Sequence, residues 1–250
     1  MKYFVIMLML MCGSLLNAQE ASLQFEEANQ AYRNAEYAKA AGLYEHIVKN
    51  GVENAELYYN LGNTYFKLKN TPAAILNYER AMRLAPQDED IGYNLRLANL
   101  RVIDKIDPVP QLFITVWWQS FVGIMSSASW AMAGIIALWG CLGAAALFLF
   151  LNIPLVRRLA FFGGVVCIFF AVIAFIAMSR QAHAESNDQL AIIFSPSVSV
   201  KSAPDIQSTD LFVVHEGVRV EILDFVGDWK KIRLADGKTG WMPGDGMRAI

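Results

Sequence analysis

Apolar residues along this chain gather in two long blocks, and the remaining segments have mixed patterns. The first block covers residues 1–18 and the second covers residues 112–178. Residues 19–107 carry apolar positions at helical spacing, whereas residues 189–250 carry short alternating runs between glycine and proline turns. The pattern therefore predicts a multidomain membrane protein with an all-α part, an apolar helical hairpin and an all-β part.

The first block has the pattern of a secretion signal. Lys2 precedes an apolar stretch from Tyr3 to Leu16, and Ala18 is a small residue ahead of a polar sequence. This apolar stretch is shorter than a membrane-spanning helix needs. We therefore expect residues 1–18 to be a signal peptide that is cleaved after Ala18. The large Met11 ahead of Cys12 disfavours a lipoprotein cysteine.

The second block is too long for one membrane-spanning helix. No charged residue lies between Asp107 and Arg157. A helix over residues 112–151 alone would be roughly 60 Å long, about twice the thickness of the hydrocarbon core. We expect a break at the polar cluster of residues 126–129. The pattern then predicts an interfacial segment over 111–127, which contains Trp117 and Trp118, and transmembrane helices over 128–151 and 159–178.

The loop between these helices, residues 152–158, predicts the orientation. It contains Arg157 and Arg158, which the positive-inside rule places in the cytoplasm. Both soluble parts then lie outside the cytoplasm, as the signal peptide also predicts. Cysteine is the only ionisable residue in the two spans, which disfavours a transporter or channel. Cys141 and Cys167 are either two small packing residues or a redox pair.

Self-similarity in residues 19–107 has a period of 34 residues. Residues 21–54 form a weaker copy of residues 55–88, and residues 89–105 repeat only the first helix and would cap the array. The stronger copy resembles the tetratricopeptide repeat (TPR), an antiparallel helical hairpin, through Tyr58, Leu61, Gly62, Tyr65, Ala74, Tyr78, Ala81 and Pro86. The resemblance implies two repeats and a capping helix.

A second set of positions recurs with the same period on one face of each first helix. The set contains aromatic, asparagine and basic residues: Phe25, Asn29, Tyr32, Arg33, Tyr59, Asn60, Asn63, Phe66, Lys67, Tyr93 and Arg101. In similar proteins this face lines a concave peptide-binding groove. We hypothesise a groove for an extended segment that carries a carboxylate. The alternative is that the aromatic residues only pack between neighbouring helices.

The groove resembles the carboxylate-clamp grooves of chaperone-binding relatives only in part. Asn29 and Asn60 match the asparagines of that pattern. Phe25, Asp90 and Asn94 stand where the pattern has Lys, Lys and Arg, so the resemblance does not carry clamp specificity to this chain.

Residues 189–250 resemble a bacterial SH3-like domain, a small β-barrel. The stretch from Gly227 to Trp241 carries the resemblance most specifically. Such modules elsewhere bind cell-wall peptides or proteins. Trp229 and Trp241 are either ligand contacts or packing residues, and residues 180–188 have the composition of a short tether to the membrane.

The order of leader, short TPR array, membrane hairpin and SH3-like barrel resembles the tetratricopeptide member of the Bat aerotolerance family (BatE type). The resemblance implies a bacterial inner-membrane protein with periplasmic soluble domains. Its implied partners are von Willebrand factor A-type membrane proteins and a MoxR-type ATPase. The function it implies is a protein-interaction scaffold in envelope stress; the alternative is a peptidoglycan-binding protein that acts through the SH3-like domain.

Charge and motifs exclude other classes of function. Residues 19–107 carry 10 basic against 13 acidic residues, and residues 180–250 carry 8 against 10, so no nucleic-acid partner is expected. The histidines lie far apart, so no metal site is expected. The chain has no nucleophile elbow, P-loop, dinucleotide fingerprint or paired-carboxylate motif, so we expect neither a cofactor nor enzymatic activity.

Overall fold

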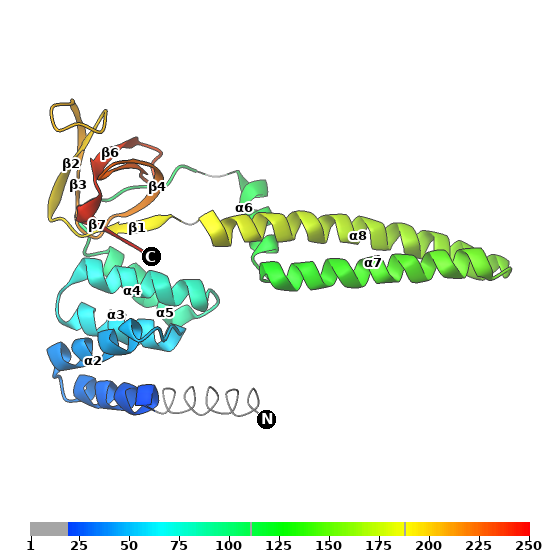
Figure 1. The fold of residues 1–250 in the computed structure, drawn as a ribbon, viewed down its shortest axis with the longest axis horizontal. Helices are drawn as coiled ribbons and strands as arrows, with labels where there is room; N and C mark the ends of the chain where they lie inside the picture. The colour runs from blue at the N-terminus through cyan, green and yellow to red at the C-terminus, as the bar shows by residue number, and fades with distance from the viewer. Residues whose placement is uncertain (1–19, 111, 188) are drawn as a thin grey trace, which may run out of the picture. The chain divides into compact units, whose positions relative to one another are not determined.

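The computed structural model describes residues 20–110, 112–187 and 189–250. The predicted signal peptide lies outside these residues. The chain divides into two compact units. One consists of the helical repeats together with the C-terminal β-strands, and the other is the segment Pro110–Asp188 (Figure 1).

The repeats are two helical hairpins and a fifth helix. Residues 20–33 pair with α2 (Tyr37–Lys49), α3 (Ala55–Lys67) pairs with α4 (Thr71–Leu84), and α5 (Glu89–Asn99) follows. Side-chain caps set the starts of the later helices. Asn54 accepts a hydrogen bond from the Leu57 amide, Asn70 from the Ala73 amide and Asp88 from the Ile91 amide.

Small residues allow the helices within each hairpin to approach closely. Ala28, Ala40 and Ala74 are fully buried. A Cβ on Gly62 would lie only 2.7 Å from the ring of Tyr78, so that ring occupies the space that any other residue would need.

The C-terminal β-strands form one antiparallel sheet of seven strands in the order β3-β2-β6-β5-β4-β1-β7, which curls around an apolar core (Figure 1). The strands are β1 (Leu190–Ile193), β2 (Ser197–Lys201), β3 (Asp210–His215), β4 (Arg219–Val226), β5 (Trp229–Arg233), β6 (Thr239–Pro243) and β7 (Met247–Ala249). We call residues 189–250 the β module. The sequence pattern does not predict β7, because three residues are too few to show alternation.

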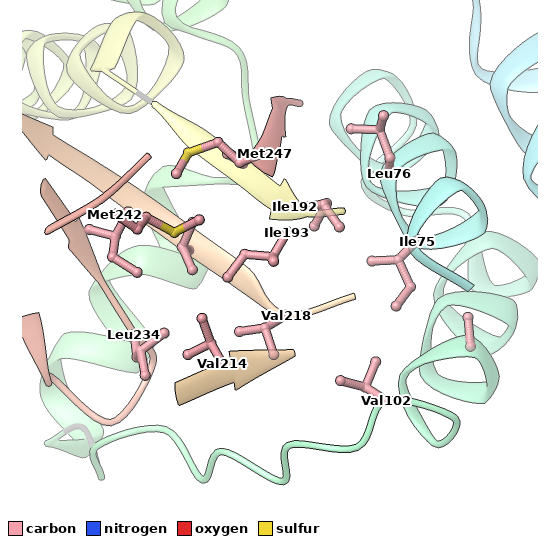
Figure 2. Packing of buried hydrophobic residues seen from close by; sticks show 14 of the residues in the cluster. Ile75, Leu76, Val102, Ile192, Ile193, Val214, Val218, Leu234, Met242 and Met247 are labelled. Atoms are coloured by element: carbon pink, nitrogen blue, oxygen red, sulfur yellow. The ribbon is translucent and has the colours of Figure 1, made fainter. Parts of the chain in front are cut away.

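One buried apolar cluster extends from the helical repeats into the β module, and we call it the shared core. Ile75 and Leu76 of α4 and Val102 after α5 join Ile192 and Ile193 of β1 in one buried cluster (Figure 2). The cluster continues into the centre of the β module through Val200, Val214, Val220, Ile232 and Met242. The sequence predicts two separate domains, whereas the structure packs them against each other in one compact unit.

Polar contacts surround this shared core. The Asp104 carboxylate accepts a hydrogen bond from the backbone amide of His215 at 2.7 Å. Its other oxygen lies 2.9 Å from Nδ1 of the His215 ring. Arg219 of β4 pairs with Glu79 of α4 at 3.2 Å. Arg80 donates to the carbonyl of Ala249 at 2.8 Å. These contacts fix the orientation of the β module on the repeats.

A tight turn explains how closely the two parts approach. Gly217 has φ of +88°, and a Cβ there would lie 3.0 Å from Val102 and 3.4 Å from Ile75. A side chain at residue 217 would therefore both strain the backbone and push α4 away from the β module.

The other unit consists of three apolar helices, α6 (Phe113–Val122), α7 (Ser127–Phe150) and α8 (Pro154–Asn187). Ser126 caps α7, and the indole nitrogen of Trp130 donates to the carbonyl of Val122 at 2.9 Å, which joins α6 to α7. Small residues face each other between α7 and α8. A Cβ on Gly164 would lie 3.5 Å from Ala144, and one on Gly134 would lie 3.6 Å from Ala174.

The helix bounds in this unit differ from those expected. Only residues 151–153 connect α7 to α8, rather than 152–158, because Pro154 needs no amide partner and starts the helix. Arg157 therefore lies in the first turns of α8, where it donates to the carbonyl of Phe148 at 3.1 Å. At its other end α8 runs past residue 178 to Asn187, so most of the expected tether is helical.

We predict that Ile75→Ala destabilises both parts of the first unit together. Ile75 lies on the side of α4 that packs against the β module and is fully buried there. Its truncation should lower the free energy of unfolding by about 2–5 kcal/mol. Hydrogen–deuterium exchange of the full chain in detergent should show faster exchange in α4 and in β1 and β4. Leu84→Ala, in the same helix but 49% exposed, is the control. Loss of protection in the repeats alone would show that the two parts fold independently.

Candidate functional site

The candidate site is the face formed by the first helices of the repeats, namely residues 20–33, α3 and α5. We call it the repeat groove. The structure places all eleven predicted site residues on these three helices or, for Arg101, directly after α5.

Asparagines in the repeat groove are joined by hydrogen bonds that recur with the period of the sequence. The Oδ1 atom of Asn29 accepts from the Tyr44 hydroxyl at 2.6 Å and from the Asn60 amide at 3.2 Å. One repeat later, Oδ1 of Asn63 accepts from the Tyr78 hydroxyl at 2.8 Å and from the Asn94 amide at 3.3 Å. We call this arrangement the asparagine ladder.

The ladder determines which atoms of the asparagines remain available. Each Oδ1 atom accepts two hydrogen bonds, the usual capacity of a carbonyl oxygen. Within the described part of the chain, the Nδ2 groups of Asn29 and Asn63 donate no hydrogen bond. The groove therefore presents amide donors, held at fixed positions by the buried tyrosines.

Burial raises the pKa of the two tyrosines that donate to the ladder asparagines. Tyr44 and Tyr78 are almost fully buried. Desolvation raises the pKa of Tyr44 to about 12 and raises the pKa of Tyr78 as well. Both hydroxyls remain protonated at neutral pH and act as hydrogen-bond donors to the asparagines.

The aromatic residues of the groove differ in exposure. Phe25 packs edge-on against Tyr44 and Tyr32 packs edge-on against Tyr37, so both contribute to helix packing. Tyr59 accepts a hydrogen bond from Asn94 at 2.7 Å. Tyr93 is different, because 61% of its surface is exposed.

The basic residues also have different surroundings. The guanidinium of Arg101 lies 3.5 Å above the ring of Phe66 and donates to the carbonyl of Phe66, which fixes its position. Arg33 is exposed and hydrogen-bonded to Gln30. The Lys67 side chain is exposed and makes no hydrogen bond or ion pair to the residues that the structure describes.

A small cavity of about 90 Å³ opens in the groove beside the first ladder asparagine, lined by Asn29, Tyr32, Arg33, Tyr44, Asn60 and Asn63. It has room for a carbonyl or carboxylate group rather than for a whole small molecule. No group of three or more His, Cys, Asp or Glu residues in the described chain has the arrangement of a metal site.

The α5 end of the groove has a different chemistry. Leu97 occupies the position of Asn29 and Asn63, and Leu100 occupies that of Tyr32 and Phe66. Leu100 is 72% exposed. Leu97 is 37% exposed, so this end of the groove presents apolar side chains.

Sequence reasoning missed three members of the ladder, Tyr44, Tyr78 and Asn94. The period contained the signal, because Tyr78 follows Tyr44 by 34 residues and Asn94 follows Asn60 by the same interval. In the clamp pattern Asn94 is only a departure, whereas in the structure its amide donates to both Asn63 and Tyr59.

The tryptophans of the β module are partly buried. Trp229 pairs with Val226 and with Pro243 across neighbouring strands. Trp241 is also half-buried, and the Lys231 ammonium lies 5.9 Å from the centre of its ring. Each indole therefore has packing partners and a solvent-accessible part.

Comparison with protein families identifies both soluble parts. Residues 55–88 match the tetratricopeptide repeat, and residues 196–247 match the bacterial SH3 domain. The predictions of a tetratricopeptide repeat and of an SH3-like domain are confirmed. β1 precedes the matched SH3 segment, so the strand that packs on α4 lies outside it. A comparison with curated proteins finds no matching sequence.

We predict that the buried tyrosines make the repeats sensitive to alkaline pH. A pKa raised by folding contributes stability that is complete below the unfolded value of 10.0 and is lost as pH rises toward the folded value, about 12 for Tyr44. The free energy of unfolding should fall over this interval, and it should fall less in Tyr44→Phe. Phenolate absorbance, recorded during the titration, should show one group fewer in the variant at high pH. Equal declines in stability in the two proteins would contradict this assignment.

Proposed function

We propose that this protein is a membrane-anchored, non-enzymatic scaffold that binds extended segments of partner proteins in its repeat groove. The observation that carries this proposal is the asparagine ladder with its unused Nδ2 donors. An extended peptide backbone offers carbonyl acceptors at regular intervals and matches such donors. The match to the tetratricopeptide repeat supports protein partners for this surface.

Basic and aromatic residues define the rest of the proposed ligand. Lys67 and Arg101 lie one repeat apart at the same position of their repeats and favour a carboxylate on the partner. Tyr93 and Leu100 are exposed, which favours apolar side chains at the α5 end of the groove.

Two features support membrane anchoring by the α7–α8 hairpin. Ser127–Phe150 and Pro154–Ala182 are long and apolar enough to cross a membrane, by length and composition. Apolar helices in soluble proteins are usually buried, but only 6% and 11% of the most apolar windows of these two helices is buried. In water they would expose far more apolar surface than monomeric proteins usually do.

The proposed orientation places residues 151–158 in the cytoplasm and both soluble parts in the periplasm. Arg157 and Arg158 support it through the positive-inside rule. By resemblance to the Bat aerotolerance family, the partners would be von Willebrand factor A-type membrane proteins of the bacterial envelope. The process would be an envelope or oxidative stress response.

The match to the bacterial SH3 domain favours a second candidate function, peptidoglycan binding. Trp229 and Trp241 would then contact the cell wall. The shared core changes how the two functions are separated, because an isolated β module would lose its contacts to Ile75 and Val102. The test therefore uses the full chain.

We predict that Lys67→Glu/Arg101→Glu abolishes capture of envelope proteins by the full chain in native membranes. Reversing both charges repels an acidic ligand and removes the stacking of Arg101 on Phe66. Crosslinking followed by mass spectrometry measures the loss, and Lys49→Glu/Lys238→Glu, which reverses two exposed charges outside the groove, is the control. If the groove variant keeps its partners while Trp241→Ala no longer sediments with peptidoglycan, the wall-binding function replaces the scaffold.

We predict that a reporter active only in the periplasm is active when fused after Ile250 and inactive when inserted after Val156. The expectation follows from the two arginines beside the turn between α7 and α8. The reverse pattern of activities would overturn the orientation.

A further inference from the structure

The two halves of the asparagine ladder have the same design but different numbers of hydrogen bonds. We call the hydrogen bond from the Asn60 amide to Asn29 the first rung, and the one from the Asn94 amide to Asn63 the second rung. Each residue of the second rung follows its counterpart in the first by one repeat. All four side chains are half-buried. Burial therefore does not distinguish the rungs, and the difference between them comes from their neighbours.

One aromatic ring accompanies each rung, and only the second ring carries a hydroxyl. Phe25 and Tyr59 occupy the same position of consecutive repeats. The centroid of the Phe25 ring lies 5.8 Å from that of Tyr44, and the centroid of the Tyr59 ring lies 6.1 Å from that of Tyr78. The two rings are therefore placed alike relative to the buried tyrosines of their rungs, but Phe25 lacks the phenolic oxygen.

The Tyr59 hydroxyl saturates the second rung. A side-chain amide has two N–H donors. The Asn94 amide donates to Asn63 at 3.3 Å and to the Tyr59 hydroxyl at 2.7 Å. The Asn60 amide donates to Asn29 at 3.2 Å, which is its one hydrogen bond within the described residues. Asn60 therefore keeps an N–H donor, whereas both donors of Asn94 are used.

The cavity of about 90 Å³ lies at the first rung, where this donor remains. Asn29, Asn60 and Arg33 are among the residues that line it. The Oδ1 atom of Asn29 already accepts two hydrogen bonds, from Tyr44 and from Asn60, so it has no capacity left for a ligand donor. A half-buried N–H group without an acceptor is unfavourable, and a ligand oxygen in the cavity would supply the acceptor. The first rung therefore suits an oxygen acceptor.

We propose that the residue at the position of Phe25 and Tyr59 determines which rung of the ladder binds a ligand. Phenylalanine leaves the first rung open to an oxygen acceptor of a partner segment, and the Tyr59 hydroxyl occupies the corresponding donor of the second rung. This inference rests on the scaffold function proposed above. It specifies the register of the bound segment, because one acceptor oxygen, from a backbone carbonyl or a carboxylate, lies beside Arg33.

Two reciprocal substitutions test the proposal on the full chain in detergent. Phe25→Tyr adds a hydroxyl at the first rung and Tyr59→Phe removes the hydroxyl at the second, so each variant differs from the wild type by a single oxygen. NMR with isotope-labelled asparagine records the side-chain amide signals, and Asn60→Ser and Asn94→Ser assign them. Acetate is the probe for a carboxylate and N-methylacetamide is the probe for a backbone carbonyl. Sodium chloride at equal concentration controls for ionic strength.

We expect at least one probe to shift the Asn60 amide signals in the wild-type chain and to leave those of Asn94 unchanged. Phe25→Tyr should weaken binding of acetate at Asn60 about tenfold, the worth of one hydrogen bond to a charged group. Tyr59→Phe should create a response at Asn94. An unchanged Asn60 response in Phe25→Tyr, equal responses of the two rungs in the wild type, or no response to either probe would overturn the proposal. Should Phe25→Tyr disturb the helix packing, a Tyr59→Phe variant without a response at Asn94 would also contradict it.

The outcomes separate this proposal from the scaffold function. If the two rungs respond alike while Lys67→Glu/Arg101→Glu still abolishes capture of envelope proteins, the selection of a rung is wrong and the scaffold stands. If the rungs respond as expected while the charge-reversed variant keeps all its partners, the scaffold is wrong and the selection of the first rung stands.

Discussion

The packing of α4 against β1 determines the organisation of the soluble part. The array ends after two helical hairpins and a fifth helix. The side of α4 and α5 on which a further helix would pack is therefore not covered by the repeats themselves. Ile75, Leu76 and Val102 lie on that side, and the β module covers them with Ile192 and Ile193. The apolar surface that would otherwise end the array becomes the centre of one core. The array is therefore capped by a β-sheet, not by a polar helix.

The asparagine ladder links this core to the proposed binding face. Tyr78 lies in the shared core, and its hydroxyl holds Asn63 on the groove side of α3. Side chains that would otherwise be mobile in solvent are thus fixed by buried donors, which lowers the entropy lost when a ligand binds. The same coupling makes the groove dependent on helix packing, because Tyr78 also fills the space beside Gly62.

The sequence predicts the local classes of structure well and their association poorly. A period of 34 residues specifies the repeats, and alternating strands between turns specify the β module, because both signals come from neighbouring residues. The packing of Ile75 in one cluster with Val218 joins residues far apart in the chain, and no local pattern encodes it. For the site, periodicity places the asparagines on one face. Only the geometry shows that their Oδ1 atoms bond to tyrosines while their Nδ2 groups remain available.

The discontinuous first unit has a consequence for biogenesis. The chain leaves this unit after Val109 and returns at Gln189, with the α6–α8 segment inserted between. During synthesis the repeats emerge first, with Ile75 and Val102 uncovered until the last 62 residues are made. Contacts between residues so far apart form slowly. A nascent chain would therefore expose an apolar strip for the time needed to translate the α6–α8 segment and the β module, and that interval is when a chaperone would be required.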